Sequence, residues 1–165
     1  MKEYPLLFTY YQPVVGRGFV AEVVCHGRAL MVEESAGEWF VYGVEPGGLA
    51  ESGATPQEAH AFFREAYRAA LFLFAEQSGS LTDFERQVAR FFAQRDEEDA
   101  ARWEAARLAI GEGVSVDAPF DCLSREKAER PRGVEVRRRL DGEQPASLLT
   151  PDLNEHDDVG LPLAA

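Results

Sequence analysis

Apolar and polar positions alternate in the first third of the chain in a way that predicts β-strands. The strand-like runs are rich in β-branched and aromatic side chains and are joined by short turns: residues 18–25, 28–34 and 38–44, with turns at 26–27 and 35–37. Short links between such runs predict three neighbouring antiparallel strands. Residues 4–15 predict one further strand at a sheet edge, because Pro5 and Pro13 have no N–H to donate to a central ladder.

A change of period after residue 48 predicts a long helix. Thr55 is typical of an N-cap, with Pro56 in the first helical position and Glu58 three residues after the cap. Residues 56–77 then carry apolar side chains at three- and four-residue spacing: Ala59, Phe62, Phe63, Ala66, Tyr67, Ala70, Leu71 and Phe74. This broad apolar face predicts a helix that packs against the sheet.

Two shorter helices are predicted after this long one. The first has a candidate cap at 82–85 and an apolar face made by Phe84, Val88, Phe91 and Phe92. The second begins with four consecutive acids at 96–99 and reaches Leu108. Acidic side chains suit this position because the N-terminal end of a helix carries partial positive charge.

Beyond residue 111 the periodicity fades, and only 134–136 indicate a short strand. Residues 140–165 hold six acids and no Lys or Arg, which is typical of an extended or disordered tail. The sequence therefore predicts an α+β fold: a three- to four-stranded antiparallel sheet packed by one long helix, a helical extension and a poorly ordered acidic tail. The expected boundaries are 1–80 for the sheet and long helix, 81–110 for the extension and 111–165 for the tail.

The charge balance narrows the classes of partner. Among 165 residues there are 29 acids and 17 Lys or Arg, which gives a net charge of −12. Such a chain repels phosphate backbones, so sequence-independent nucleic-acid binding is not expected, and a basic protein is the better-matched partner. The longest apolar stretch in a helical context, 69–75, is far shorter than a membrane span, and the first residues do not resemble a signal peptide. We expect a cytoplasmic protein that does not contact membranes.

Few residues indicate catalytic or metal chemistry. Cys25 and His26 are adjacent in a predicted strand, so their side chains point to opposite faces. His60 is expected at the margin of the long helix, and His156 lies among acids of the tail without a rigid ligand geometry. We therefore expect no catalytic residue, metal or cofactor. An enzyme that uses Cys25, or a carboxylate cluster such as Glu33 and Glu34, remains an alternative.

Aromatic side chains in the third predicted strand suggest a binding surface. Trp39, Phe40 and Tyr42 fall on both faces of that strand, and the face away from the helix needs a cover. The candidate partner contacts combine these aromatics with acids near the sheet edge and in the tail: Trp39, Tyr42, Glu45, Glu51, Asp152, Glu155, Asp157 and Asp158.

Residues 15–77 resemble HicB-like antitoxin domains. The similarity is carried by the strand 18–23, the Pro-Gly-Gly turn at 46–48 and the motif Gly-x-Thr-x-x-Glu-Ala at 53–59. The resemblance implies a partial ribonuclease-H-like fold of three strands and a helix without working catalytic carboxylates. It also implies that the chain neutralises a small basic HicA-type ribonuclease. Many such proteins add a C-terminal domain that binds operator DNA.

The leading expectation is thus a non-catalytic antitoxin or inhibitory binding protein for a small basic partner, possibly a HicA-like toxin. The alternative is a self-associating interaction domain, and a homo-oligomer is expected in either case. Operator binding is doubtful, because residues 81–110 have a net charge of −2 and the acids 96–99 would face the phosphates.

Overall fold

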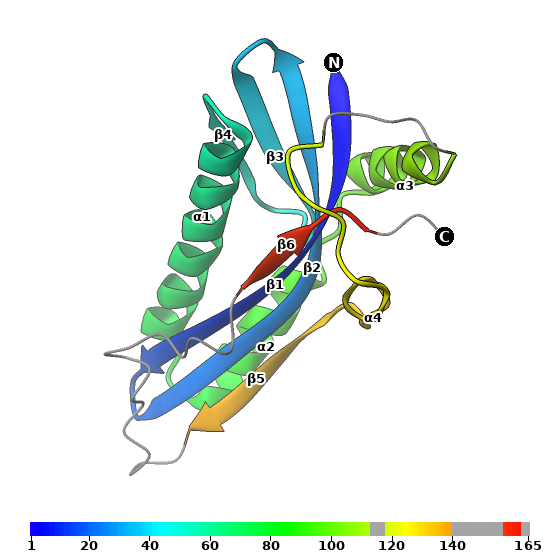
Figure 1. Ribbon diagram of the computed structural model, residues 1–165. Helices are drawn as coiled ribbons and strands as arrows, with labels where there is room; N and C mark the ends of the chain where they lie inside the picture. The colour runs from blue at the N-terminus through cyan, green and yellow to red at the C-terminus, as the bar shows by residue number, and fades with distance from the viewer. Residues whose placement is uncertain (113–117, 140–156, 163–165) are drawn as a thin grey trace.

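The computed structural model describes residues 1–112, 118–139 and 157–162 and shows an α+β fold. The described residues form four helices and one antiparallel sheet of six strands (Figure 1). The sheet thus has more strands than the three or four expected. The elements in chain order are β1 Lys2–Gly16, β2 Phe19–Ser35, β3 Glu38–Glu45, β4 Ala50–Gly53, α1 Pro56–Gln77, α2 Leu81–Phe92, α3 Glu97–Gly111, α4 Arg125–Ala128, β5 Gly133–Arg139 and β6 Asp158–Gly160.

Strand β2 is the centre of the sheet and changes its partner halfway along. On one side it pairs with β1 from Phe19 to Glu33. On the other side it pairs with β5 from Val20 to His26 and with β3 from Arg28 onward. The prediction of a turn at 26–27 is therefore wrong, because β2 is continuous. Gly27 instead allows the Phe8 ring and the Glu45 backbone to lie close to β2. A Cβ at position 27 would lie 2.3 Å from the Phe8 ring and 2.5 Å from the Glu45 carbonyl oxygen.

Strand β1 covers the predicted segment 4–15 and lies near the edge of the sheet. Its outer side pairs with β6 at Leu7, Phe8 and Thr9. Pro5 and Pro13 lie outside this stretch, which agrees with the confinement of proline to edge positions.

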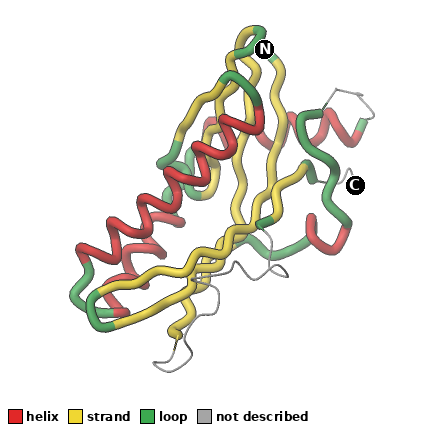
Figure 2. The backbone as a smooth tube through the Cα atoms, turned by 60° about the vertical axis from the view of Figure 1, so that its left-hand side comes forward, coloured by secondary structure: helices red, strands yellow, loops and turns green. Residues whose placement is uncertain are grey.

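Helices cover both faces of the sheet (Figure 2). The main core lies between the sheet and the pair α1 and α2, and it contains Phe63, Tyr67 and Phe84. A second, smaller core lies on the opposite face, where Trp103 of α3 is fully buried against Leu7 and Leu30 of the sheet. The indole Nε1 of Trp103 donates to the Leu6 carbonyl at 3.0 Å, which fixes α3 to β1.

The helix starts follow the capping rules. Thr55 caps α1 as predicted: its hydroxyl accepts from the Glu58 N–H, and the Glu58 carboxylate accepts from the Ala54 N–H. Helix α2 is capped by Ser80 rather than by the predicted 82–85 segment. Asp96, the first of the four acids, caps α3 by accepting from the Asp99 N–H.

Residues after 117 join the body of the protein where the structure describes them, which corrects the expectation of a poorly ordered tail for these parts. Strand β5 extends the predicted 134–136 strand, and β6 adds to the edge of β1. Residues 121–123 close the outer side of the β6 segment through hydrogen bonds with Leu161. Within the described residues, no helix is both long and apolar enough to cross a membrane.

Candidate partner-binding surface

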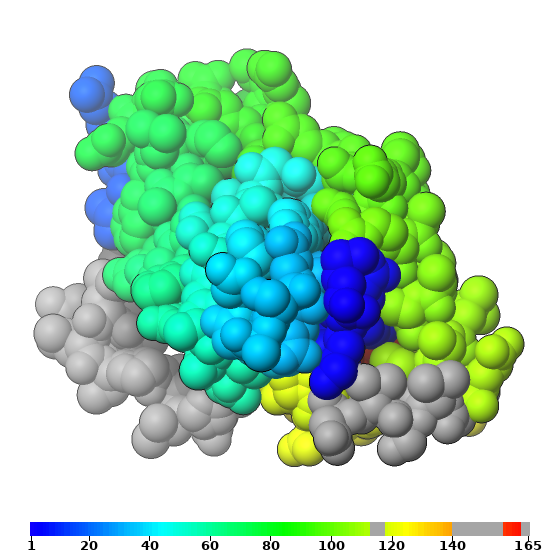
Figure 3. Space-filling view, turned by 90° about the horizontal axis from the view of Figure 1, so that it is seen from above, coloured from blue at the N-terminus to red at the C-terminus, as the bar shows by residue number. Residues whose placement is uncertain are grey.

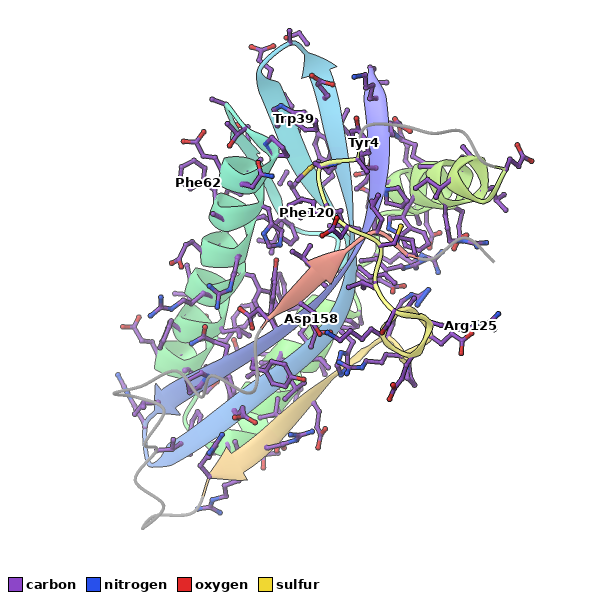
Figure 4. The ribbon with its side chains drawn as sticks, in the orientation of Figure 1. Tyr4, Trp39, Phe62, Phe120, Arg125 and Asp158 are labelled. Atoms are coloured by element: carbon purple, nitrogen blue, oxygen red, sulfur yellow. The ribbon has the colours of Figure 1, made fainter. Side chains whose placement is uncertain are left out.

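The two predicted aromatic contacts lie on opposite faces of β3. Trp39 faces the main core and stacks on Tyr4 with 5.8 Å between ring centroids (Figure 4). Tyr42 packs against the second core, donates its hydroxyl to the Glu34 carboxylate at 3.2 Å and lies under the Arg102 guanidinium. Both rings are half-buried, so each one contributes mainly to packing within the chain.

Glu45 is engaged inside the fold. Its carboxylate accepts from Nη2 of Arg28 at 2.8 Å and from Nε at 3.2 Å. Arg28 is buried, and its remaining side pairs with Glu104 at 3.4 Å and covers the Trp103 ring. This ion pair joins β2, β3 and α3, so the Glu45 carboxylate has a structural partner already.

The acids of the predicted tail separate into two groups. Asp152 and Glu155 lie outside the described residues. Asp157 accepts from the Tyr11 N–H at 2.9 Å and pairs with Arg64 of α1. Asp158 pairs with Lys127 at 2.9 Å. Asp157 and Asp158 therefore attach the β6 segment to the body.

Glu51 is the predicted contact that remains at a surface. It lies on the edge strand β4 opposite Val41, so it points to the face that α1 covers, and it is half-exposed. Strand β4 lies beside the start of α1, because a Cβ on Gly53 would meet the Ala59 backbone at 2.6 Å. In Figure 3 the turquoise atoms of this region adjoin the green atoms of the rest of α1.

The outer side of α1 carries an apolar strip that the sequence analysis missed. Phe62, Phe72 and Leu73 are 48%, 37% and 49% exposed. Phe62 was predicted to lie on the buried face, but it lies on the side of α1 turned away from the sheet (Figure 4). Together with Ala69, these residues follow the three- and four-residue spacing of one helix side.

Acids border this strip. Glu58, Glu65 and Glu76 are exposed and lie within one helical turn of its apolar side chains. Two cations lie beside the strip: Arg68 pairs with Glu65 at 3.7 Å and stacks over the Phe72 ring, and Arg17 lines a surface hollow together with Leu73 and Glu76. We call this region the α1–β4 surface, defined by Glu51, Glu58, Phe62, Glu65, Ala69, Phe72, Leu73 and Glu76.

The interior polar groups are set up for packing rather than nucleophilic chemistry. Burial raises the pKa of the Cys25 thiol to about 12, so it stays protonated at neutral pH. Burial, and then the nearby Arg64, lower the pKa of His60 to about 4. His60 Nε2 is 2.8 Å from the Tyr10 hydroxyl, and its ring meets Phe120 edge-on. Among the described residues, no group of three His, Cys, Asp or Glu is arranged to hold a metal ion.

Comparisons with protein-family models, with curated proteins and with solved structures gave no match for this chain.

Proposed function

We propose that this chain is a non-catalytic binding protein that inhibits a small basic protein by covering part of its surface with the α1–β4 surface. The observation that carries the proposal is the exposed apolar strip of Phe62, Phe72 and Leu73 with acids along its borders. Large apolar side chains gathered on a soluble surface favour association, because contact with a partner removes them from water.

The charge of the surface specifies the partner. Three exposed acids of α1, Glu58, Glu65 and Glu76, lie beside the strip, whereas Arg68 is already paired with Glu65. A partner with apolar side chains bordered by Lys and Arg complements this pattern. The net charge of −12 attracts such a partner from a distance and raises its association rate.

The specific form of the proposal is an antitoxin of the HicB type that covers a small ribonuclease. It rests on the resemblance of residues 15–77 to that family and on charge. A ribonuclease binds RNA phosphates with cationic side chains. An acidic cover can occupy those side chains in place of RNA.

The absence of catalysis in this proposal has its own support. The Cys25 thiol is buried and protonated, and its neighbour His26 points to the other face of β2. Glu33 pairs with Lys2 at 3.3 Å, and Glu34 accepts a hydrogen bond from the Tyr42 hydroxyl. Each of these two acids thus has its own partner, and they do not form a carboxylate pair.

Self-association is a second candidate, because Phe62, Ala66, Ala69 and Leu73 follow the 4-3-4 spacing of a helix-pairing seam. Two copies joined at this seam would bring their acidic borders together. This repulsion makes the basic partner the better occupant.

The proposal is tested with the tagged full-length chain in its native lysate, followed by binding measurements on each purified captured protein. We expect a small basic protein whose activity the chain inhibits. The double variant F62S/L73S should bind it at least about tenfold more weakly, the equivalent of about 1.4 kcal/mol. The matched control is Leu108→Ser on α3, which removes a side chain of similar exposure, 57%, away from the α1–β4 surface.

Circular dichroism checks that both variants keep the fold of the parent chain. Equal affinity of F62S/L73S and the parent for the basic partner would overturn the α1–β4 surface as its site. A dimer of the parent chain that F62S/L73S dissociates, with no basic partner captured, would replace the proposal with self-association.

A further inference from the structure

A small basic depression lies on the sheet face that α3 covers, opposite the face that α1 covers. It is formed by β1, β2 and the α4 segment. The depression is shallow and leaves about 20 Å³ for the centres of water-sized atoms, room for one or two waters. The polar groups around it come from two strands and from residues 127–132 and 158: Thr9, His26, Lys127, Arg130, Arg132 and Asp158.

The cations around the depression outnumber the acids. Asp158 is the carboxylate of its lining, and it is 2.9 Å from Lys127 and 4.0 Å from Arg130. Arg132 lies over the Trp103 ring at 5.7 Å, and the carboxylates of Glu45 and Glu104 are near enough to raise its pKa. Three cations and one acid give this lining a charge of +2 (3 − 1) in a chain whose net charge is −12.

The environment of nearby groups shows the same surplus of positive charge. The pKa of His26 is lowered by burial and then by Arg130 and Arg137. The pKa of Arg132 is lowered by burial and then by Arg28, whereas Glu45 and Glu104 raise it, as Glu135 raises the pKa of His26. Positive charges thus crowd this site, and an anion placed among them relieves the repulsion.

We propose that this depression, which we call the Arg132 pocket, binds a phosphate group, either free or carried by a small phosphate monoester. Such a group carries a charge of about −1.5 to −2 at neutral pH, which matches the surplus of +2. The guanidinium groups of Arg130 and Arg132 offer paired N–H donors that suit phosphate oxygens, and Lys127 adds a third cation.

The surroundings restrict the ligand to small molecules. A nucleic acid brings many phosphates, and the net charge of −12 over the whole chain repels such a polyanion. Thr9 and His26 are linked by a 2.9 Å hydrogen bond between Oγ1 and Nδ1. This bond leaves His26 Nε2 as a further polar contact at the pocket wall.

The pocket is independent of the proposed inhibitory function. Leu7 and Thr9 of its lining belong to the sheet face covered by α3, whereas the α1–β4 surface belongs to the opposite face. Phosphate binding can therefore fail while partner binding holds, and the reverse.

The test is titration of the full-length chain with inorganic phosphate and with phenyl phosphate, followed by calorimetry and by amide chemical shifts in NMR spectra. We expect saturable binding by the parent, with shift changes at residues 127–132, and at least about tenfold weaker binding by Arg132→Gln. The matched control is Arg125→Gln in the same segment. The Arg125 side chain is 80% exposed, pairs with Glu129 and is not part of the pocket lining (Figure 4).

The two probes separate the sources of the phosphate group. Tighter binding of phenyl phosphate identifies a monoester as the ligand, and equal binding identifies free phosphate. The absence of saturation at about 10 mM of either probe, or equal binding by Arg132→Gln and the parent, would overturn the proposal. Arg130→Gln provides a second variant if Arg132→Gln does not fold.

Discussion

Glu45 holds Arg28 by two hydrogen-bonded contacts, 2.8 and 3.2 Å, at the position where β2 exchanges β5 for β3 as its partner. The two residues are also paired across β2 and β3, so strand register and ion pair support each other. The guanidinium lies over Trp103, which extends the link to α3. One buried cation thereby connects three elements.

We predict that Glu45→Gln destabilises the fold. The variant keeps the shape of the side chain but replaces the charged partner of the buried Arg28 with a neutral amide that has one acceptor oxygen, beside the longer contact to Glu104. The expected loss is about 3 kcal/mol in the free energy of unfolding, measured by urea denaturation. Lys2→Gln is the control, because the Lys2 side chain of the Lys2–Glu33 pair is 58% exposed and loss of the pair should cost about 0.5 kcal/mol or less. Equal effects of the two substitutions would contradict the structural role of Glu45.

Gly27→Ala should also destabilise the fold, for a steric reason. The added methyl group would meet the Phe8 ring at 2.3 Å and the Glu45 carbonyl oxygen at 2.5 Å. The carbonyl is backbone and cannot move aside cheaply, so we expect a loss of about 2 kcal/mol or more. Gly133→Ala on the paired strand has no heavy atom within 4 Å of the new methyl group and should leave the melting temperature unchanged or slightly raised. A Gly27→Ala protein as stable as the parent would show that no close approach exists at this position.

The two cysteines should differ sharply towards thiol reagents. Cys25 is buried with its pKa raised to about 12 by burial, whereas Cys122 is exposed. The thiolate is the reactive form. With a chromogenic disulfide reagent, the native protein should therefore show about one reactive thiol per chain, and the unfolded protein about two. Cys122→Ser should remove the fast reaction. Fast labelling of Cys25 in that native variant would refute the buried placement of its thiol.

His60 should make stability fall with acidification. Its pKa is about 4 in the folded chain, against 6.5 when unperturbed, because burial and then Arg64 disfavour the charged ring. Between these values the unfolded chain binds more protons, so stability contributed by neutral His60 is present above pH 6.5 and is lost as the pH falls towards 4. At pH 5 the loss is about 2 kcal/mol, since each unit corresponds to about 1.4 kcal/mol.

The measurement is urea denaturation at pH 7 and pH 5 for the parent and for His60→Gln. The parent should lose more stability between the two pH values than the variant, in which the carboxylates and His26 still titrate. An equal loss in both proteins would show that His60 does not cause the pH dependence.

Local signals in the sequence were sufficient for the helices. Helix α1 begins at Pro56 and ends at Gln77 as predicted, because the cap Thr55 and the partner Glu58 lie next to the bonds they make. The start of α3 at the acids 96–99 is confirmed for the same reason. In α2 two hydroxyl residues compete for the cap, and Ser80 makes the hydrogen bond.

Contacts between distant residues were beyond the sequence. Glycine at position 27 signals both a turn and a close approach, and only the position of Phe8 decides between them. Glu45 looked like a surface acid because Arg28 is 17 residues away in the chain. Phe62 is exposed because the buried face of α1 follows Ala59, Phe63, Tyr67, Leu71 and Ala75, and the available signal was that α1 is apolar on more than one side.

The change of partner along β2 also orders the events of synthesis. The hairpin of β1 and β2 and the pairing of β2 with β3 join residues that are near in the chain, so they can form as soon as about 45 residues have emerged from the ribosome. The stretch from Val20 to His26 waits for residues 133–139, more than 100 positions later. During that interval one backbone edge of β2 has no strand beside it. A growing chain of this protein therefore presents an open β-edge, and chaperones or neighbouring nascent chains meet it before β5 does.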